Sequence, residues 1–240
     1  MVKSMKEVFM KVKNNENYFL KKGTLKIVGA AMAALGFLLY FVGWGWISYI
    51  IICTFIPIGA ALFIVGSSGR SSDEDIDEFI SVKMRELDPG LETDKKYSSR
   101  LVKNDGFFEL EGYEFREGLM FQKTKSGSVR SSEFTKTLMY FLTDGVYLIS
   151  RRISLIADEA GEDVILELPI GEIDRAEISE EMKSFSFNGN LFRVKDMRLR
   201  ILMKDGKEIS LPIHDDLRSE GAAERINRAV EIYHKEISNQ

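Results

Sequence analysis

A long stretch without charge is the strongest pattern along this chain. From Ile27 to Gly69 there is no Asp, Glu, Lys or Arg, although charged residues are frequent on both sides. One helix needs about 20 apolar residues to cross a bilayer, whose hydrocarbon core is about 30 Å thick. A single helix over the whole stretch would extend about 65 Å at a rise of about 1.5 Å per residue. The pattern therefore predicts two membrane-spanning helices rather than one.

A short turn separates the two predicted helices. Glycine weakens a helix and tryptophan prefers the headgroup boundary, so the sequence Gly-Trp-Gly-Trp at 43–46 is the natural break. We expect a transmembrane helical hairpin over 25–66, with spans at about 25–43 and 46–66. Pro57 should kink the second span. A buried hairpin in the core of a soluble protein is the alternative, but buried helices rarely lack charge on every face.

The lysines before the first span give the predicted orientation. Residues 1–24 form a basic segment, whereas the turn between the spans has no charge. Lysines next to a span are retained on the cytoplasmic side. Two spans return the chain to the side where it began. We therefore expect a multi-pass protein of the cell membrane with both termini in the cytoplasm.

Small residues form a strip on the first predicted helix. Gly29, Ala30, Ala33 and Ala34 recur at four-residue spacing, which lets another helix approach closely. The strip either packs against the second helix of the same chain or contacts another membrane protein.

Beyond the hairpin, the pattern predicts a short helix and then strands. Residues 67–106 are expected to form a linker with an acidic helix that begins near Asp73 and ends at Pro89-Gly90. From Phe107 onward, apolar residues alternate with polar ones, which is typical of half-buried strands. We expect a β domain over 107–240.

Tight turns divide this domain into short antiparallel strands. Asp144-Gly145, Asn188-Gly189 and Asp205-Gly206 each lie between runs of β-forming residues, which is a strong hairpin signal. An amphipathic helix is expected over 217–237, because its apolar residues recur at helical spacing. The expected strands are 108–115, 119–123, 135–143, 146–150, 164–168, 173–178, 184–187, 191–194, 197–203 and 209–213.

This layout resembles the pleckstrin-homology-like (PH-like) superfold, in particular the bacterial PH and GRAM-type modules. The resemblance covers about 107–240 and rests on Phe141–Tyr147, on Leu168-Pro169-Ile170 leading to Ile173, and on Met203–Lys207. It implies a mostly antiparallel β domain with a C-terminal helix. The expected fold class is thus an α+β membrane protein, in which a transmembrane hairpin precedes a cytoplasmic PH-like domain.

Charge is unevenly divided along the chain, and this limits the partners. Of the net charge of −4, residues 1–26 carry +5 and Arg70 adds one, which leaves −10 for residues 73–240. So acidic a domain repels nucleic acid. The single cysteine, Cys53, excludes a disulfide framework and a thiolate zinc cluster.

Two polar clusters contain residue types that can bind metals. His214, Asp215 and Asp216 could hold a metal, but aspartates that cap the following helix are the commoner explanation. The carboxylates around Gly161 do not have the spacing of a calcium loop. The chain also lacks a serine nucleophile elbow, a phosphate-binding glycine loop and a zinc-hydrolase motif. We therefore expect no enzyme, catalytic residue, cofactor, metal or small-molecule substrate.

Basic side chains in the β domain are candidates for contact with lipid headgroups. In PH-like folds, basic residues near the open end of the sheet can bind such headgroups, and this is what the resemblance implies for Arg151, Arg152, Arg193 and Lys195. The alternative is that these are ordinary outward-facing strand residues, as alternation predicts for Arg198.

Binding is therefore the expected function, and three forms of it remain open. The first is an interaction module that binds a protein partner or a second copy of itself at the membrane. The second is a sensor of anionic lipid. The third is an accessory subunit of a larger transporter or membrane enzyme complex.

Overall fold

The structure is a computed structural model of the 240-residue chain. The chain divides into two compact units, Met1–Glu74 and Asp75–Gln240, which are described separately. The described residues are 5–20, 24–42, 45–67, 69–85, 87, 95–102, 107–157, 161, 163–214 and 216–238.

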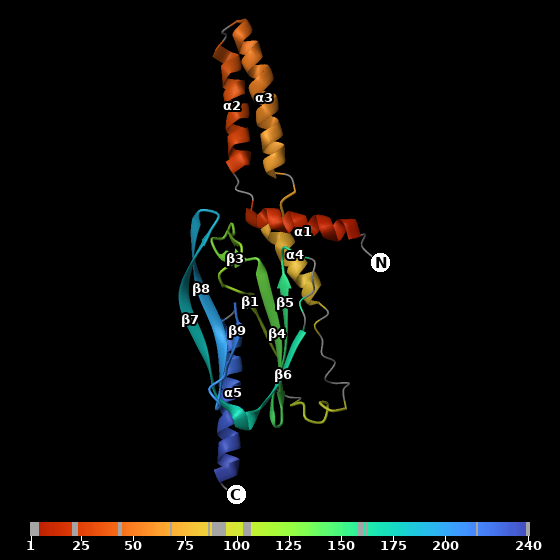
Figure 1. The fold of residues 1–240 in the computed structure, drawn as a ribbon, viewed down its shortest axis with the longest axis vertical. Helices are drawn as coiled ribbons and strands as arrows, with labels where there is room; N and C mark the ends of the chain where they lie inside the picture. Colours follow the sequence, from red (N-terminus) through yellow and green to blue (C-terminus); the bar gives the residue numbers. More distant parts are fainter. Residues whose placement is uncertain are drawn as a thin grey trace. The chain divides into compact units, whose positions relative to one another are not determined.

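Three helices make up the first unit. They are α1 (Met5–Leu20), α2 (Thr24–Val42) and α3 (Trp46–Ser67), and Pro57 lies inside α3. The last two run side by side as a hairpin (Figure 1). Helices therefore form where the charge-free pattern predicted them.

Glycines hold α2 and α3 close together. A Cβ atom added to Gly29 would lie 2.5 Å from the backbone nitrogen of Phe63, and one added to Gly59 would lie 2.6 Å from the backbone nitrogen of Ala33. Only residues without a side chain allow backbones to approach this closely. Gly29 and Ala33 of the predicted strip thus pack against the second helix of the same chain, whereas Ala30 and Ala34 are exposed.

The membrane prediction is contradicted by the structure. Outward side chains of the hairpin, such as Phe37, Phe41 and Trp46, are apolar and exposed. Within the described part of the chain, however, no helix combines the length and the apolar character needed to cross a membrane. The sequence pattern predicted two spans, at about 25–43 and 46–66, and the structure has one helix over each of them. The first of these helices, α2, includes Lys26, so only 27–42 of α2 is free of charge, which is short of about 20 residues.

Several predictions are corrected by this finding. They are the transmembrane hairpin over 25–66, the membrane part of the fold class, and the location as a multi-pass protein of the cell membrane with both termini in the cytoplasm. Of the predicted turn at 43–46, Gly43 and Trp44 lie outside the described residues.

Polar contacts hold α1 against the segment that follows α3. The Ser71 hydroxyl donates to the buried Asn15 side chain at 2.6 Å, and the Tyr18 hydroxyl donates to Asp73 at 2.6 Å. Asn17 donates to the carbonyl of Gly69, whose φ of +66° favours glycine. These contacts fix the chain just before the acidic helix α4 (Asp73–Met84).

Two antiparallel sheets form the body of the second unit, with a small hairpin beside them (Figure 1). One sheet has the order β1-β4-β5-β6 and the other has the order β7-β8-β9, while β2 and β3 pair only with each other. The strands are β1 (Phe107–Tyr113), β2 (Phe121–Lys123), β3 (Val129–Ser131), β4 (Glu133–Leu142), β5 (Gly145–Ser154), β6 (Asp163–Pro169), β7 (Ile173–Phe187), β8 (Asn190–Met203) and β9 (Glu208–Pro212).

Two of the three predicted tight turns occur where the sequence places them, and the third is displaced by one residue. The turn between β4 and β5 consists of Thr143 and Asp144, so Gly145 is already the first residue of β5. Asn188 and Gly189 join β7 to β8 with φ angles of 50° and 73°. Gly206, between β8 and β9, has a φ of 86°. The predicted strands 173–178 and 184–187 are, by contrast, parts of the single long strand β7, whose register shifts once between Ile173 and Arg175.

The core of this unit lies between the two sheets and the helix α5 (Asp216–Ser238). Ile226 of α5 and Leu199 and Ile201 of β8 are fully buried there. The side chain of Asn227 accepts from the backbone nitrogen of Ala176 and donates to its carbonyl, both at 2.8 Å. The predicted C-terminal helix at 217–237 is confirmed, and so is an α+β fold with antiparallel sheets.

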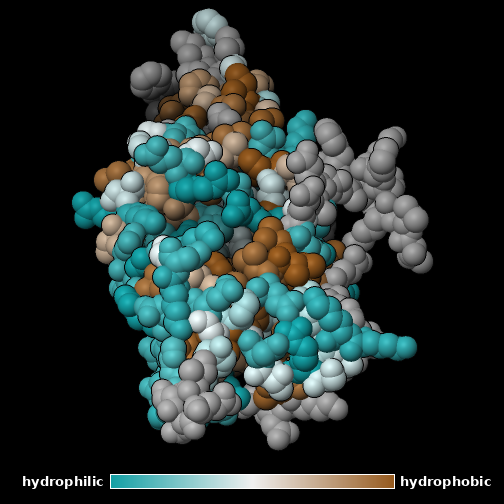
Figure 2. Space-filling model, turned by 60° about the horizontal axis from the view of Figure 1, so that its bottom comes forward, coloured by the Kyte–Doolittle hydropathy of each residue, from teal (hydrophilic) through white to brown (hydrophobic). Residues whose placement is uncertain are grey.

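Hydrophilic residues cover most of the visible surface of the β unit (Figure 2). Large apolar side chains that remain exposed in this unit include Phe107, Met182 and Leu191.

Candidate binding cleft

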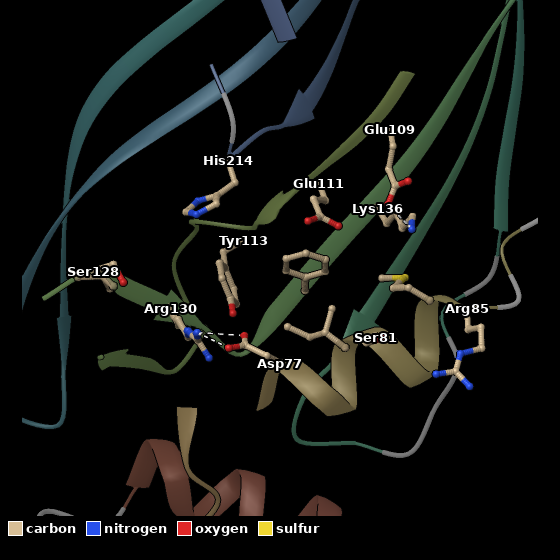
Figure 3. Close-up of a pocket in the computed structure, with 14 residues that line it drawn as sticks. Asp77, Ser81, Arg85, Glu109, Glu111, Tyr113, Ser128, Arg130, Lys136 and His214 are labelled. Carbon is tan, nitrogen blue, oxygen red and sulfur yellow. Dashed lines mark hydrogen bonds and ion pairs between the residues drawn. The ribbon is translucent and has the colours of Figure 1, made fainter. Parts of the chain in front are cut away.

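A cleft of about 550 Å³ lies in the second unit, between α4 and one face of the first sheet (Figure 3). Its walls come from α4, β1, β3 and β4, and His214 closes one end. We call it the main cleft. Alternation along β1 explains the face that it uses, since Leu110 points into the core while Glu109 and Glu111 point into the cleft.

Buried apolar side chains form the floor of the main cleft. Ile80 and Met84 lie four residues apart on one face of α4, and both are buried. Phe134 of β4 meets them from the sheet, and its ring packs edge-on against Tyr113 at 5.1 Å between centroids. This floor is rigid, because aromatic and aliphatic groups pack against each other beneath it.

Two ion pairs brace the walls. Arg130 of β3 donates to Asp77 of α4 at 3.0 Å and also lies over the Tyr113 ring (Figure 3). Lys136 of β4 pairs with Glu109 on the neighbouring strand. These four charges therefore satisfy one another and fix the position of α4 and β3 around the cleft.

Glu111 and His214 remain available in the main cleft. Neither side chain has a hydrogen bond or ion pair within the described part of the chain. In Figure 3 the Glu111 carboxylate lies between the Tyr113 end and the Lys136 end, and His214 lies above Tyr113. Arg85, another charged residue of the lining, points away from the floor. Glu111 is thus the free charge best placed to meet a ligand.

A second cavity of about 350 Å³ adjoins the main cleft. The two share four lining residues, which are Tyr113, Ser128, Val129 and His214. Arg193 and Lys195 of β8 line the second cavity only.

The structure does not bring the four predicted headgroup residues together. Arg151 and Arg152 are consecutive in β5, so their side chains point to opposite faces. Arg151 donates to Asp163 at 2.6 Å on the face that carries Lys136, whereas Arg152 lies 3.8 Å from Glu114.

The other two predicted residues share one face and one cavity. Arg193 and Lys195 are two apart on β8 and line the second cavity. Lys195 pairs with Glu180 at 2.8 Å, while Arg193 has no ion pair within the described ranges.

A buried ionic network that sequence reasoning missed lies next to these cavities. Arg198 of β8 donates to Glu114 at 2.8 Å and to Asp196 at 3.1 Å, and Lys183 donates to Asp196 at 2.6 Å. Both carboxylates are almost fully buried. Burial alone would lower the pKa of Arg198, but Glu114 and Asp196 raise it above its ordinary value. Arg198 is therefore a structural cation rather than an outward-facing one.

Neither of the two polar clusters was expected from the sequence to bind a metal. Among the described residues, no group of three His, Cys, Asp or Glu side chains lies close enough to hold a metal. Asp215 of the His214 cluster is outside the described residues, and so are Asp158, Glu159 and Glu162 of the carboxylate cluster.

The sequence missed the main cleft because it depends on the docking of α4. Glu109 and Glu111 alternate with apolar residues in the sequence, but nothing in their spacing shows that a distant helix covers the face that they share with Tyr113. The only signal was the apolar face of α4, which had to be buried on some surface.

Comparison with known proteins gives no relative for this chain. No family model, no curated protein and no solved structure matches it. The resemblance to PH-like modules therefore stays a prediction.

Proposed function

We propose that the β unit is a non-enzymatic binding module that holds an extended segment of a protein partner in the main cleft. The observation that supports this most strongly is the free carboxylate of Glu111 above a buried apolar floor. Such a combination suits a segment with a basic side chain next to an apolar one. The basic group would pair with Glu111, and the apolar group would rest on Phe134 and Met84.

Binding fits the other charges of the cleft better than catalysis does. Asp77, Arg130, Glu109 and Lys136 are already engaged in ion pairs across the walls. Groups held in this way shape a site and exclude mismatched charges, because a like charge next to them is unfavourable. They leave Glu111 to select the ligand.

The charge of the region favours a basic partner. Residues 73–240 carry −10, so a basic partner is attracted before contact and an acidic one is repelled. Association should then slow as salt is added, because salt screens this attraction beyond about 10 Å at 0.1 M.

Site-specific photo-crosslinking tests the proposal. In one variant of this chain a photoreactive residue replaces Ser81, which lines the main cleft. In a control variant the photoreactive residue replaces Glu117, an exposed loop position outside the main cleft. We expect a discrete crosslinked partner from the Ser81 position only. The variant Glu111→Lys should lose that crosslink, whereas the matched variant Glu117→Lys should keep it.

The outcome also distinguishes the two kinds of protein partner. A crosslinked product of twice the chain mass would identify a second copy of this protein, and any other mass would identify a different partner. Equal crosslinking of the wild type and Glu111→Lys would refute the main cleft as the binding site.

A further inference from the structure

The second cavity differs from its neighbours in charge. The main cleft is lined by three carboxylates and three Lys or Arg side chains. A third cavity of about 380 Å³, over β7, β8 and β9, has the same balance of three and three. The second cavity contains Arg193, Lys195 and His214 but no carboxylate in its lining. In a region that carries −10, a cavity whose charged lining residues are Arg193 and Lys195 is an unexpected feature.

Arg193 differs from other arginines of the β unit because no carboxylate of the described residues pairs with it. Other arginines of the β unit, including Arg116, Arg130, Arg151, Arg175, Arg198 and Arg200, each pair with a carboxylate. Arg193 has no such pair among the described residues and is exposed. A guanidinium presents N–H donors in a planar fork that matches the oxygens of a phosphate group. Its donors are free to bind such a group without first breaking an ion pair.

Hydroxyl groups and open space complete the site. Ser128 and Tyr113 line the cavity opposite the strand that carries Arg193. The Ser128 hydroxyl belongs to a chain of hydroxyls, since it lies 2.7 Å from that of Thr124. Hydroxyls of this kind commonly donate to phosphate oxygens together with arginine. The space beside Gly127 is open, because a Cβ atom there would meet only the Lys123 side chain at 3.8 Å.

We propose that the second cavity binds a phosphomonoester group. Arg193 is the principal binding residue, and Lys195, His214 and Ser128 surround the bound group. The group could belong to a free small phosphate or to a phosphorylated lipid headgroup, because both present the same oxygens. This site does not depend on the proposed function of the main cleft, from which it differs in its key residue.

Calorimetry and vesicle flotation with the full-length chain test the proposal. The calorimetric probe is inorganic phosphate, with sodium chloride of equal ionic strength as the blank. Flotation uses vesicles of phosphatidylcholine alone and of phosphatidylcholine with phosphatidylinositol 4-phosphate. The test variant is Arg193→Gln. The matched control is Arg175→Gln, an exposed arginine of β7 outside the cavity that pairs with Asp174.

We expect Arg193→Gln to weaken phosphate binding about tenfold, the value of one charge-assisted hydrogen bond. Arg175→Gln should bind as the wild type does. Phosphate binding that depends on Arg193 supports the site with a free phosphate as ligand. Flotation that depends on Arg193, without binding of inorganic phosphate, supports it with a lipid headgroup as ligand. Binding of neither probe, or equal loss in the two variants, overturns the proposal.

Discussion

Arg198 of β8 and Glu114, which directly follows β1, form a 2.8 Å ion pair although 84 residues separate them in sequence. Glu114 is only 6% exposed, and it also accepts from the Thr135 hydroxyl at 3.0 Å. Because β1 belongs to one sheet and β8 to the other, this pair joins the two sheets outside their common apolar core.

Replacing Arg198 by Met should destabilise the β unit by about 3 kcal/mol, because it leaves Glu114 buried without its closest cation. The midpoint of urea-induced unfolding measures this loss. Arg175→Met removes an arginine whose ion pair is exposed at both ends, so we expect a change within about 0.5 kcal/mol. Equal losses in the two variants would show that the network contributes nothing beyond surface charge.

Phe121 anchors the β2–β3 hairpin to the long β7–β8 hairpin. Its buried ring stacks on Phe185 at 4.8 Å between centroids and lies near Phe187 and Phe192 as well. Phe121→Ala should therefore cost about 3–5 kcal/mol and release β2 and β3 first. Hydrogen exchange at the amides of these two strands measures the release.

Phe107 provides the matched control for this prediction. It is also aromatic and stacks on Tyr140 at 5.4 Å, but it is half exposed at the start of β1. Phe107→Ala should cost about 1 kcal/mol and leave exchange in β2 and β3 unchanged. Faster exchange in those strands in both variants would contradict the anchoring role of Phe121.

Local signals predicted the β unit well because they act over few residues. Asn188-Gly189 and Asp205-Gly206 place glycine at positive φ, and this backbone requirement can be seen in the sequence itself. The stripe of apolar residues on α5 likewise needed only helical spacing. Turns and amphipathic faces were therefore correct to within a few residues.

Contacts over long distances in sequence could not be predicted in this way. Glu114 and Arg198 each looked like an ordinary strand charge, since alternation says which face a residue uses but not what covers that face. The same limit applies to the main cleft, where Asp77 of α4 meets Arg130 of β3 across 53 residues. The Glu114–Arg198 ion pair and the main cleft both depend on which distant elements of the chain pack together.

Close packing of α2 and α3 makes Gly29 intolerant of any side chain. A Cβ atom there would lie 2.5 Å from the backbone nitrogen of Phe63, so Gly29→Leu must force the helices apart. Spin labels at the exposed positions Ile27 and Ile64 would report a longer distance between the helices. Ala60→Leu, at an exposed position of α3, should leave the distance unchanged. An unchanged distance in Gly29→Leu would contradict the packing.

Acid should remove the stabilisation that Arg100 gives to Glu167. The guanidinium of Arg100 donates to Glu167 at 2.7 Å, and this hydrogen bond lowers the pKa of the carboxyl below its ordinary value of 4.5, against a smaller opposing effect of burial. A group whose pKa is lowered in the folded state adds stability above its unfolded pKa and loses it as the pH falls through the folded value.

Arg100→Gln should therefore lower the melting temperature at pH 7 by about 1–2 °C, as expected for an exposed pair. The difference from the wild type should shrink as the pH falls from about 4.5 through the lowered pKa that Glu167 has in the folded wild type, because below that value the carboxyl is protonated in both proteins. Lys204→Gln removes the same charge from an exposed site without an ion pair among the described residues, and it should show no such pH dependence. If Arg100→Gln differs from the wild type by the same amount at pH 3 and pH 7, the hydrogen bond to Glu167 is not the source of the stabilisation.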